Sequence, residues 1–260
     1  MRLEGSVALV TGSSKGIGRA IALTLAQQGI RVVLSYHDRE SHAQQTRAEF
    51  ERAGVDFLLV KSNLVDSDNA AQLVQQTLAH FGQLDILVNN LERGGWPVIH
   101  GALSPEQWDL EVDTTLKSKF LCYRAAQPYL QQRPQGCVLN IASIAALTGR
   151  RHLYGQIFAD AYAAAAAGIL TLTQNWARDM APHVRVNCLM LGLIATRHGP
   201  HTLGWQTLSA DTRSAIVQHT PLQRLGTLDD VASAALFLIR DATFMTGQTL
   251  VLDGGISLVL

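Results

Sequence analysis

The sequence predicts an α/β fold in which helices cover both faces of a doubly wound parallel sheet of about seven strands. Two observations carry this prediction. Short apolar segments alternate with longer segments of helical periodicity along nearly the whole chain, as in strand–helix–strand units. The first apolar segment, VALV at 7–10, also runs directly into a glycine-rich turn before the first helical segment. A chain of 260 residues with 47% hydrophobic content can bury such a core.

The predicted elements follow this alternation in order. The strands read as short, buried apolar runs and are expected at 6–11, 31–36, 56–61, 84–89, 136–142, 184–190 and 248–252. The helices show helical apolar spacing, several with start signals at Ser104-Pro105 or Thr227, and are expected at 17–28, 40–53, 67–81, 105–131, 159–181 and 228–240. Because the sequence contains no Pro/Ser-rich linker or repeat, residues 1–260 are predicted to form a single domain. Residues 197–220 break the alternation beyond a strand's carboxyl end, where an irregular insert would serve as a substrate lid.

Composition excludes several classes of function. The 21 basic and 21 acidic residues balance, which leaves no basic surface for nucleic acid or acidic membranes. No apolar run reaches the roughly 18 residues that span a bilayer, and the amino terminus enters the first strand without a signal peptide. Cys122, Cys137 and Cys188 are too few and too scattered for a disulfide framework or a zinc site. We therefore expect a cytoplasmic protein whose partners are a small-molecule substrate and copies of itself.

The segment VALVTGSSKGIG at 7–18 has the pattern of a phosphate-binding turn. Its glycines permit positive φ and leave no side chain between the backbone and a ligand. Amide groups at the start of the following helix can then bind a diphosphate, as in Rossmann-type dinucleotide-binding domains. The residues of this turn expected to contact a cofactor are Gly12, Ser14, Lys15, Gly16, Ile17 and Gly18. A glycine-rich turn without a ligand would explain the same spacing, so the motif alone leaves both interpretations open.

Several further motifs carry a resemblance to a known family. They are TGSSKGIG at 11–18, LDILVNN at 84–90, IAS at 141–143, VRVN at 184–187, GLIAT at 192–196 and TGQTLVLDGG at 246–255. In these motifs the chain resembles the short-chain dehydrogenase/reductase family, in the branch that includes the ketoacyl carrier-protein reductases. The resemblance runs from about Gly5 to Ile256. It implies a hydride-transfer enzyme with the fold predicted above.

The resemblance also implies a nicotinamide cofactor. Family members that use NAD usually place an acid at the end of the second strand, where it accepts hydrogen bonds from the ribose 2′-hydroxyl. Tyr36 occupies this position, and Lys15 and Arg39 are expected to face a 2′-phosphate, so we predict NADP rather than NAD. Asp38 opposes this assignment, and solvated surface charges are the alternative explanation. By family position, the other expected cofactor contacts are Asn63, Asn90, Ile194 and Thr196.

The catalytic residues implied by the resemblance are incomplete. In the family, a tyrosine moves the proton, a serine holds the substrate oxygen, a lysine lowers the pKa of the tyrosine, and an asparagine supports a water relay. Tyr162 and Ser143 match the tyrosine and the serine, whereas Ala166 and Thr115 stand at the lysine and asparagine positions. A nearby cation typically lowers a pKa by about 1 to 3 units, so losing the lysine forfeits up to about 4 kcal/mol of acid–base assistance.

Other residues compete for these roles or compensate for the loss. Lys119 lies one helical turn after Thr115 and is a candidate replacement cation, with a surface lysine as the alternative. Tyr154 is a rival proton donor, although Phe158 follows it at the lysine spacing. The segment around Tyr154 contains further charges that are either substitute cations or solvated side chains: Arg150, Arg151 and His152.

The loop after the fourth predicted strand also departs from the family pattern. Leu91 and Glu92 follow Asn90 where relatives have small residues that let the cofactor lie close. An inward carboxylate at Glu92 would oppose an anionic cofactor. We nevertheless expect the dinucleotide to bind.

Two functions from different classes therefore stand. The first is an NADP-preferring oxidoreductase with atypical or weak catalysis. The second is a non-catalytic member that serves as a cofactor-binding sensor or an oligomerising subunit. The resemblance implies a homodimer or homotetramer formed through the helices at 105–131 and 159–181. Ala163–Ala167 would permit close packing there, and the high helix propensity of alanine is the alternative explanation for this run.

Overall fold

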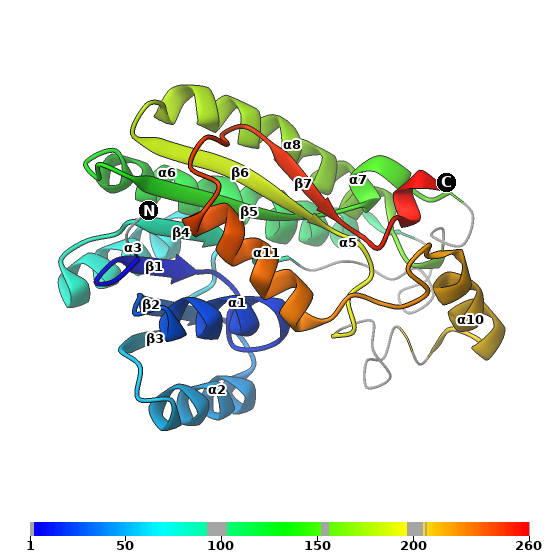
Figure 1. Ribbon diagram of the computed structural model, residues 1–260, viewed down its shortest axis with the longest axis horizontal. Coiled ribbons are helices and arrows are strands. Elements are labelled where there is room, and N and C mark those ends of the chain that lie inside the picture. Colours follow the sequence, from blue (N-terminus) through cyan, green and yellow to red (C-terminus); the bar gives the residue numbers. More distant parts are fainter. Residues whose placement is uncertain (1–2, 93–102, 152–155, 197–204, 206, 260) are drawn as a thin grey trace.

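The computed structural model describes residues 3–92, 103–151, 156–196, 205 and 207–259. Its seven strands form one sheet in the order β3-β2-β1-β4-β5-β6-β7 (Figure 1). Every neighbouring pair is parallel, which confirms the predicted sheet. The strands are β1 (Val7–Val10), β2 (Arg31–Tyr36), β3 (Phe57–Lys61), β4 (Ile86–Asn89), β5 (Gly136–Ser143), β6 (Val184–Leu191) and β7 (Thr249–Leu252).

Helices cover both faces of this sheet. Successive residues of a strand point to opposite faces, so Ala8 and Val10 of β1 join one core cluster while Val7 and Leu9 join another. The first cluster includes buried residues of α1, α2 and α11, and the second includes those of α3, α6 and α8. The longer helices are α1 (Gly16–Gln27), α2 (Glu40–Arg52), α3 (Ser67–Phe81), α5 (Pro105–Val112), α6 (Ser118–Leu130), α8 (Asp160–Met180), α10 (Ala210–His219) and α11 (Leu228–Arg240).

Two predicted helix starts are confirmed by their capping contacts. Ser104 precedes α5, and its Oγ accepts a hydrogen bond from Gln107 N (3.2 Å). Thr227 precedes α11 and forms a reciprocal capping box with Asp230. These side chains satisfy amide groups that the first helical turn leaves without partners, which fixes where each helix begins.

The helix predicted over 105–131 is present but is not uniform. A π-helical turn, η1 (Asp113–Lys117), separates α5 from α6. Such a turn changes which side chains share a face on either side of it. Apolar periodicity over a long window averages out this local change, so the sequence gives no warning of it.

The prediction that 197–220 is irregular is wrong for part of that range, because α10 lies within it. Ser209 caps this helix through a hydrogen bond from Thr212 N (3.0 Å). Of the α10 residues only Ile216 is buried, so the helix carries almost no apolar periodicity. The short helices α7 (Ala145–Thr148) and η3 (Ile256–Leu258) were likewise not predicted. Within the described ranges, no helix has the length and apolar character to cross a bilayer.

Candidate functional site

The sheet has a topological switch point between β1 and β4. β2 and β3 lie on one side of β1, and β4 to β7 lie on the other, so the connections leaving β1 and β4 run to different parts of the sheet. Ligands of open α/β sheets bind beyond the carboxyl ends of the strands at such a position. We define the switch point here as the glycine turn at 11–18 and the residues 89–91 that follow β4.

The glycine turn has the backbone geometry of an anion cradle. Gly12 and Gly16 have positive φ angles of 62° and 54°. At Gly18, a Cβ atom would lie 2.6 Å from the main-chain oxygen of Gly12 and 2.5 Å from Asn90 Nδ2, so a side chain does not fit. α1 begins without a side-chain cap and without an acid in its first turn. The positive end of its dipole is therefore free of capping carboxylates, which fits a bound diphosphate.

Side chains from β2 and from the end of β4 fix the shape of this turn. Asn90 Nδ2 donates to the carbonyl oxygens of Thr11 (2.9 Å) and Gly12 (3.1 Å). Ser35 Oγ accepts from Gly12 N (3.1 Å), and Ser13 Oγ accepts from Ser35 N (3.0 Å). Asn90 is predicted as a cofactor contact, and its amide nitrogen serves the cradle itself. The role of Ser35 was missed, because a single serine at a strand end gives no periodic signal.

The bulky residue after Asn90 packs against the same turn. A Cβ atom on Gly12 would lie 3.2 Å from Leu91 Cα and 3.3 Å from Leu91 Cδ1. The amide of Leu91 donates to Thr11 Oγ1 (3.1 Å). Leu91 and Glu92 are half-buried. The backbone at Leu91 therefore forms one wall of the switch point.

Positive charges gather beside the glycine turn, near the start of α2. The pKa of His42 lies below its ordinary value, because burial and then the positive charges of Lys15, Arg39 and Arg19 disfavour protonation. Arg19 also lies 3.5 Å from a carboxylate oxygen of Glu49. The sequence pairs only Lys15 and Arg39 here; Arg19 and His42 enter this group because the glycine turn and the start of α1 lie beside α2.

Tyr36, at the end of β2, interacts with the start of α2. Its hydroxyl donates to Glu40 Oε2 (3.0 Å). Burial, followed by this carboxylate, raises the pKa of the Tyr36 phenol. Glu40 also accepts from Gln44 Nε2 (2.8 Å), and its pKa is lowered mainly by that bond. The acid that contacts the end of β2 is thus Glu40 of α2, and the last residue of the strand itself is Tyr36.

The other predicted cofactor contacts lie at the same edge of the sheet. Thr196 adjoins the cradle, since its Oγ1 would be 3.0 Å from a Cβ atom on Gly16. Ile194 is 2% exposed and forms a bridge with Gly226. Ile17 packs against the core cluster that contains the buried residues of α1, α2 and α11. Asn63 lies two residues after β3. The carbonyl oxygen of Ser14 accepts a hydrogen bond from Thr46 Oγ1 (2.8 Å).

The two predicted catalytic hydroxyl residues lie on adjoining segments. Ser143 ends β5, and its Oγ accepts a hydrogen bond from Ala145 N (3.2 Å). Tyr162 lies in the first turn of α8 and is 6% exposed. Its ring belongs to an apolar cluster with Ile144 and Ala145, the two residues that follow Ser143, and with Trp205 of the predicted lid.

The lysine and asparagine positions hold buried uncharged residues. Ala166 lies one turn after Tyr162 on α8 and is 1% exposed. Thr115 lies in η1, and its buried Oγ1 has no hydrogen-bond partner among the described residues. Neither position therefore supplies a charge to the site.

The candidate replacement cations differ sharply in their surroundings. Lys119 is 1% exposed, which excludes the surface-lysine interpretation. Arg150 forms an exposed ion pair with Asp160 (3.4 Å), and Arg151 is exposed. His152 and Tyr154 lie outside the described residues.

The cysteines carry no metal or nucleophilic chemistry in the described part of the chain. All three are free and buried. Burial raises the pKa of Cys122 and of Cys188 to about 12, so both remain thiols. No group of His, Cys, Asp and Glu within the described ranges is arranged to hold a metal ion.

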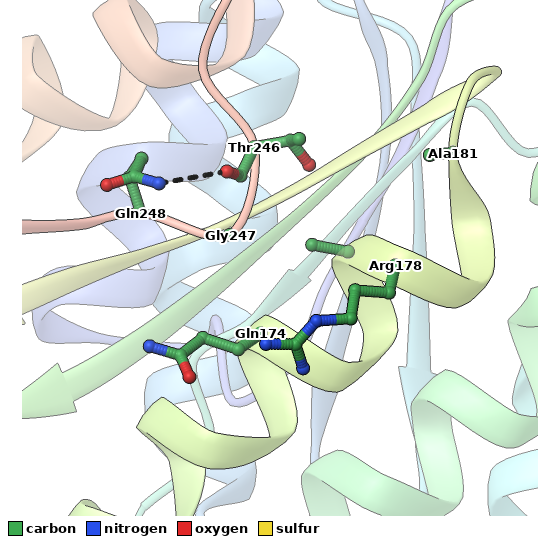
Figure 2. Close-up of a pocket in the computed structure, with 7 residues that line it drawn as sticks. Gln174, Arg178, Ala181, Thr246, Gly247 and Gln248 are labelled. Carbon is green, nitrogen blue, oxygen red and sulfur yellow. Dashed lines mark hydrogen bonds between the residues drawn. The ribbon is translucent and has the colours of Figure 1, made fainter.

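A surface hollow of about 450 Å³ lies at the opposite edge of the sheet (Figure 2). It is formed by the end of α8, including Gln174 and Arg178, and by the segment just before β7. Gln248 Nε2 donates across this segment to the Thr246 carbonyl (3.2 Å). Because the amino ends of the strands meet at this edge, the hollow is separate from the switch point.

Comparisons with known proteins agree with this architecture. A protein-family model described as enoyl-(acyl carrier protein) reductase matches residues 12–257. The 3-oxoacyl-(acyl-carrier-protein) reductase FabG of Staphylococcus aureus is 32% identical over 252 residues, which cover 95% of this chain and 96% of that protein. The dehydrogenase subunit BbsD of Thauera aromatica, named for a hydroxy(phenyl)methylsuccinyl-CoA substrate, is 35% identical over 262 residues, or 99% of each chain.

A solved structure extends the likeness to the fold. A short chain dehydrogenase from Burkholderia cenocepacia, determined in complex with NADP, matches with a TM-score of 0.84 and 29% identity. The match covers 98% of this chain and 99% of that one. It therefore includes the glycine turn, the switch point and α8.

Proposed function

Because this chain belongs to the short-chain dehydrogenase/reductase family, we propose that it is an NADP-preferring oxidoreductase acting on a carbonyl or alcohol. The observation that carries the proposal is the cradle at Gly18, where a Cβ atom would clash with both the Gly12 carbonyl and Asn90. This close packing brings the uncapped start of α1 against the turn, so its main-chain amides are placed to bind a diphosphate.

The preference for NADP rests on the charges beside β2. Lys15, Arg39 and Arg19 all act on His42, so their positive charges lie near one another beside the cradle, and Glu49 offsets that of Arg19. A 2′-phosphate adds negative charge to the adenosine end of the dinucleotide, and arginine and lysine are its usual partners. The NADP complex of the Burkholderia relative supports the same preference.

We propose that Tyr162 and Ser143 handle the substrate oxygen. When bound, the nicotinamide supplies or accepts the hydride at the substrate carbon. In reduction, the Tyr162 phenol donates its proton to the oxygen of the carbonyl, and the resulting phenolate recovers a proton from solvent. Ser143 accepts one bond from Ala145 N, so its own hydroxyl hydrogen remains to donate to the substrate oxygen.

The segment 197–220 is proposed to cover the substrate. Trp205 and Leu208 of this segment pack in the same cluster as Tyr162 and Ile144, so an apolar surface adjoins the phenol. The Staphylococcus and Thauera relatives are named for acyl thioesters. A 3-oxoacyl thioester or a related ketone is therefore the first substrate class to test.

A non-catalytic role is the second candidate, and Ala166 is the observation that favours it. This buried residue leaves α8 without a cation one turn after Tyr162. A chain that keeps the cradle but lacks this charge would bind the dinucleotide as a sensor or as a subunit of an oligomer.

Two aromatic side chains are exposed on α5 and α6, Trp108 (41%) and Phe120 (37%), and they fit the proposed homodimer or homotetramer. The buried thiols fit the proposed cytoplasmic location.

Turnover assays separate the two candidates. Oxidation of NADPH is followed with ketones, 3-oxoacyl thioesters and quinones, using wild type and Tyr162→Phe. Tyr123→Phe is the matched control, because Tyr123 is also buried and its hydroxyl has no hydrogen-bond partner among the described residues. The enzyme proposal expects turnover that falls at least a hundredfold in Tyr162→Phe and stays unchanged in Tyr123→Phe. Wild-type rates equal to the buffer rate across the panel would refute it.

A further inference from the structure

Lys119 is a cation placed inside the molecule beside the switch point. It lies in the first turn of α6, and its side chain is 1% exposed. Its Nζ donates to the carbonyl oxygens of Leu91 (2.6 Å) and Thr115 (3.0 Å). Burial of an ammonium group costs stability, and apolar side chains fill such positions at lower cost. A buried lysine bound to two main-chain oxygens therefore calls for a reason beyond packing.

The first of these oxygens belongs to the wall of the cradle. Leu91 packs on Gly12, and its amide donates to Thr11 Oγ1 (3.1 Å). Its carbonyl is held from the other side by Lys119. The ammonium thus fixes a peptide segment that contacts both α6 and the glycine turn.

The second oxygen belongs to the π-helical turn. Thr115 lies in η1, at the position where the family has its asparagine. The bond from Lys119 ties this turn to the loop after β4, so two segments that are distant in sequence share one donor. Leu116 of the same turn would contact a Cβ atom on Gly168 of α8 at 3.1 Å, which extends the link to the helix that carries Tyr162.

The charge of Lys119 acts on the sheet as well as on its own helix. It favours the thiolate of Cys122 on α6 and of Cys188 on β6, although burial outweighs it and keeps both pKa values high. The ammonium is therefore close enough to act on β6.

We propose that Lys119 is the positioning residue of this site: its ammonium holds the Leu91 backbone against the glycine turn and ties it to the π-helical turn. The inference rests on the proposed dinucleotide function. An ammonium behind the cradle wall favours an anionic ligand, and its two hydrogen bonds keep that wall in place before the ligand arrives.

The test replaces the ammonium and compares a neighbouring lysine. Lys119→Met keeps an unbranched side chain of nearly the same length and removes the ammonium, which carries the charge and donates both hydrogen bonds. Lys117→Met is the matched control, because Lys117 is exposed, lies two residues away and pairs only with Asp113 (3.2 Å) among the ion pairs of the described chain. NADPH affinity and amide hydrogen exchange at residues 90–91 are measured for both variants and for wild type.

We expect Lys119→Met to weaken NADPH binding at least tenfold, or about 1.4 kcal/mol. Exchange at the Asn90 and Leu91 amides should rise at least tenfold, with no change in Lys117→Met. Where Lys119→Met does not fold, Lys119→Gln replaces it, since the shorter carboxamide removes the charge and keeps a hydrogen-bond donor. A folded variant with affinity within twofold of wild type and unchanged exchange overturns the proposal.

The two readouts keep the inference separate from the proposed function. A wild-type protein that ignores NADPH refutes the proposed function. The exchange of the Leu91 amide in the ligand-free protein then still decides whether Lys119 holds the wall. Activity adds a further distinction: a positioning role raises the KM for NADPH more than it lowers kcat, whereas general loss of structure lowers the active fraction and leaves KM unchanged.

Discussion

Gly18→Ala is the substitution that most directly tests the shape of the cradle. The added Cβ atom would lie 2.5 Å from Asn90 Nδ2, 2.6 Å from the Gly12 oxygen and 3.0 Å from Ser13 Cα. Ordinary contacts begin near 3.4 Å, so the turn must move by roughly 0.8 Å. Two of the three obstacles are backbone atoms, which cannot rotate away as a flexible side chain does.

Two opposing effects set the change in folding stability of Gly18→Ala, and a third sets the change in its NADPH affinity. Alanine in a helix is favoured over glycine by about 1 kcal/mol. Overpacking typically costs about 1–3 kcal/mol. The net loss of stability is therefore at most about 2 kcal/mol, which leaves the protein folded. The atoms that must move belong to the turn that shapes the proposed diphosphate site, so we expect NADPH affinity to fall at least tenfold, or about 1.4 kcal/mol.

The assay is calorimetric titration of NADPH into wild type, Gly18→Ala and Gly168→Ala, with thermal unfolding as the check on folding. Gly168 is the matched helical control, because its Cβ atom would meet only the flexible end of Leu116. Its affinity should stay within twofold of wild type. If Gly18→Ala binds NADPH as tightly as wild type does, the assignment of this turn as the diphosphate site is wrong.

Three further predictions concern charge, catalysis and assembly. Asp230 accepts hydrogen bonds from Arg224 and Thr227, and these hold its pKa well below the ordinary value of about 3.8, so its stabilising effect is full above that value and is lost as pH falls further. Asp230→Asn should therefore cost about 1 kcal/mol in urea unfolding at pH 7, and an equal loss at pH 3 would contradict this explanation. Ala166→Lys should raise kcat at least tenfold at pH 7 if Tyr162 is the proton donor, and the gain should vanish in the Tyr162→Phe background. Trp108→Glu with Phe120→Glu should reduce the mass measured by light scattering, because carboxylates would replace exposed aromatic side chains on α5 and α6; an unchanged mass places the interface elsewhere.

The fold could be predicted from the sequence because its signals are local and repeated. Each strand from β1 to β7 is a run of apolar residues within one or two positions of the expected bounds, and the strands are separated by helices. α10 escaped prediction because its single buried residue, Ile216, leaves no periodic pattern. The turn η1 escaped because one turn of altered hydrogen bonding does not change the residue types around it.

The site was predictable only where a residue type has one dominant use. The need for glycine at 12, 16 and 18 could be predicted, because each position has a positive φ angle or leaves too little space for a side chain. Lys119 could not be distinguished from a surface lysine, since its burial depends on how α6 packs against the loop after β4. Ser35 likewise gains its role only when β2 lies beside β1. Such contacts depend on which segments pack together in the folded protein, and the spacing of residues along the sequence does not reveal this.

Calorimetric titration of the wild-type protein with NADPH and with NADH tests the central claim most directly. We expect a saturable site for NADPH and weaker binding of NADH, because the 2′-phosphate is proposed to lie against the positive charges of Lys15 and Arg39. No binding of either dinucleotide, in protein that unfolds cooperatively on heating, would contradict it.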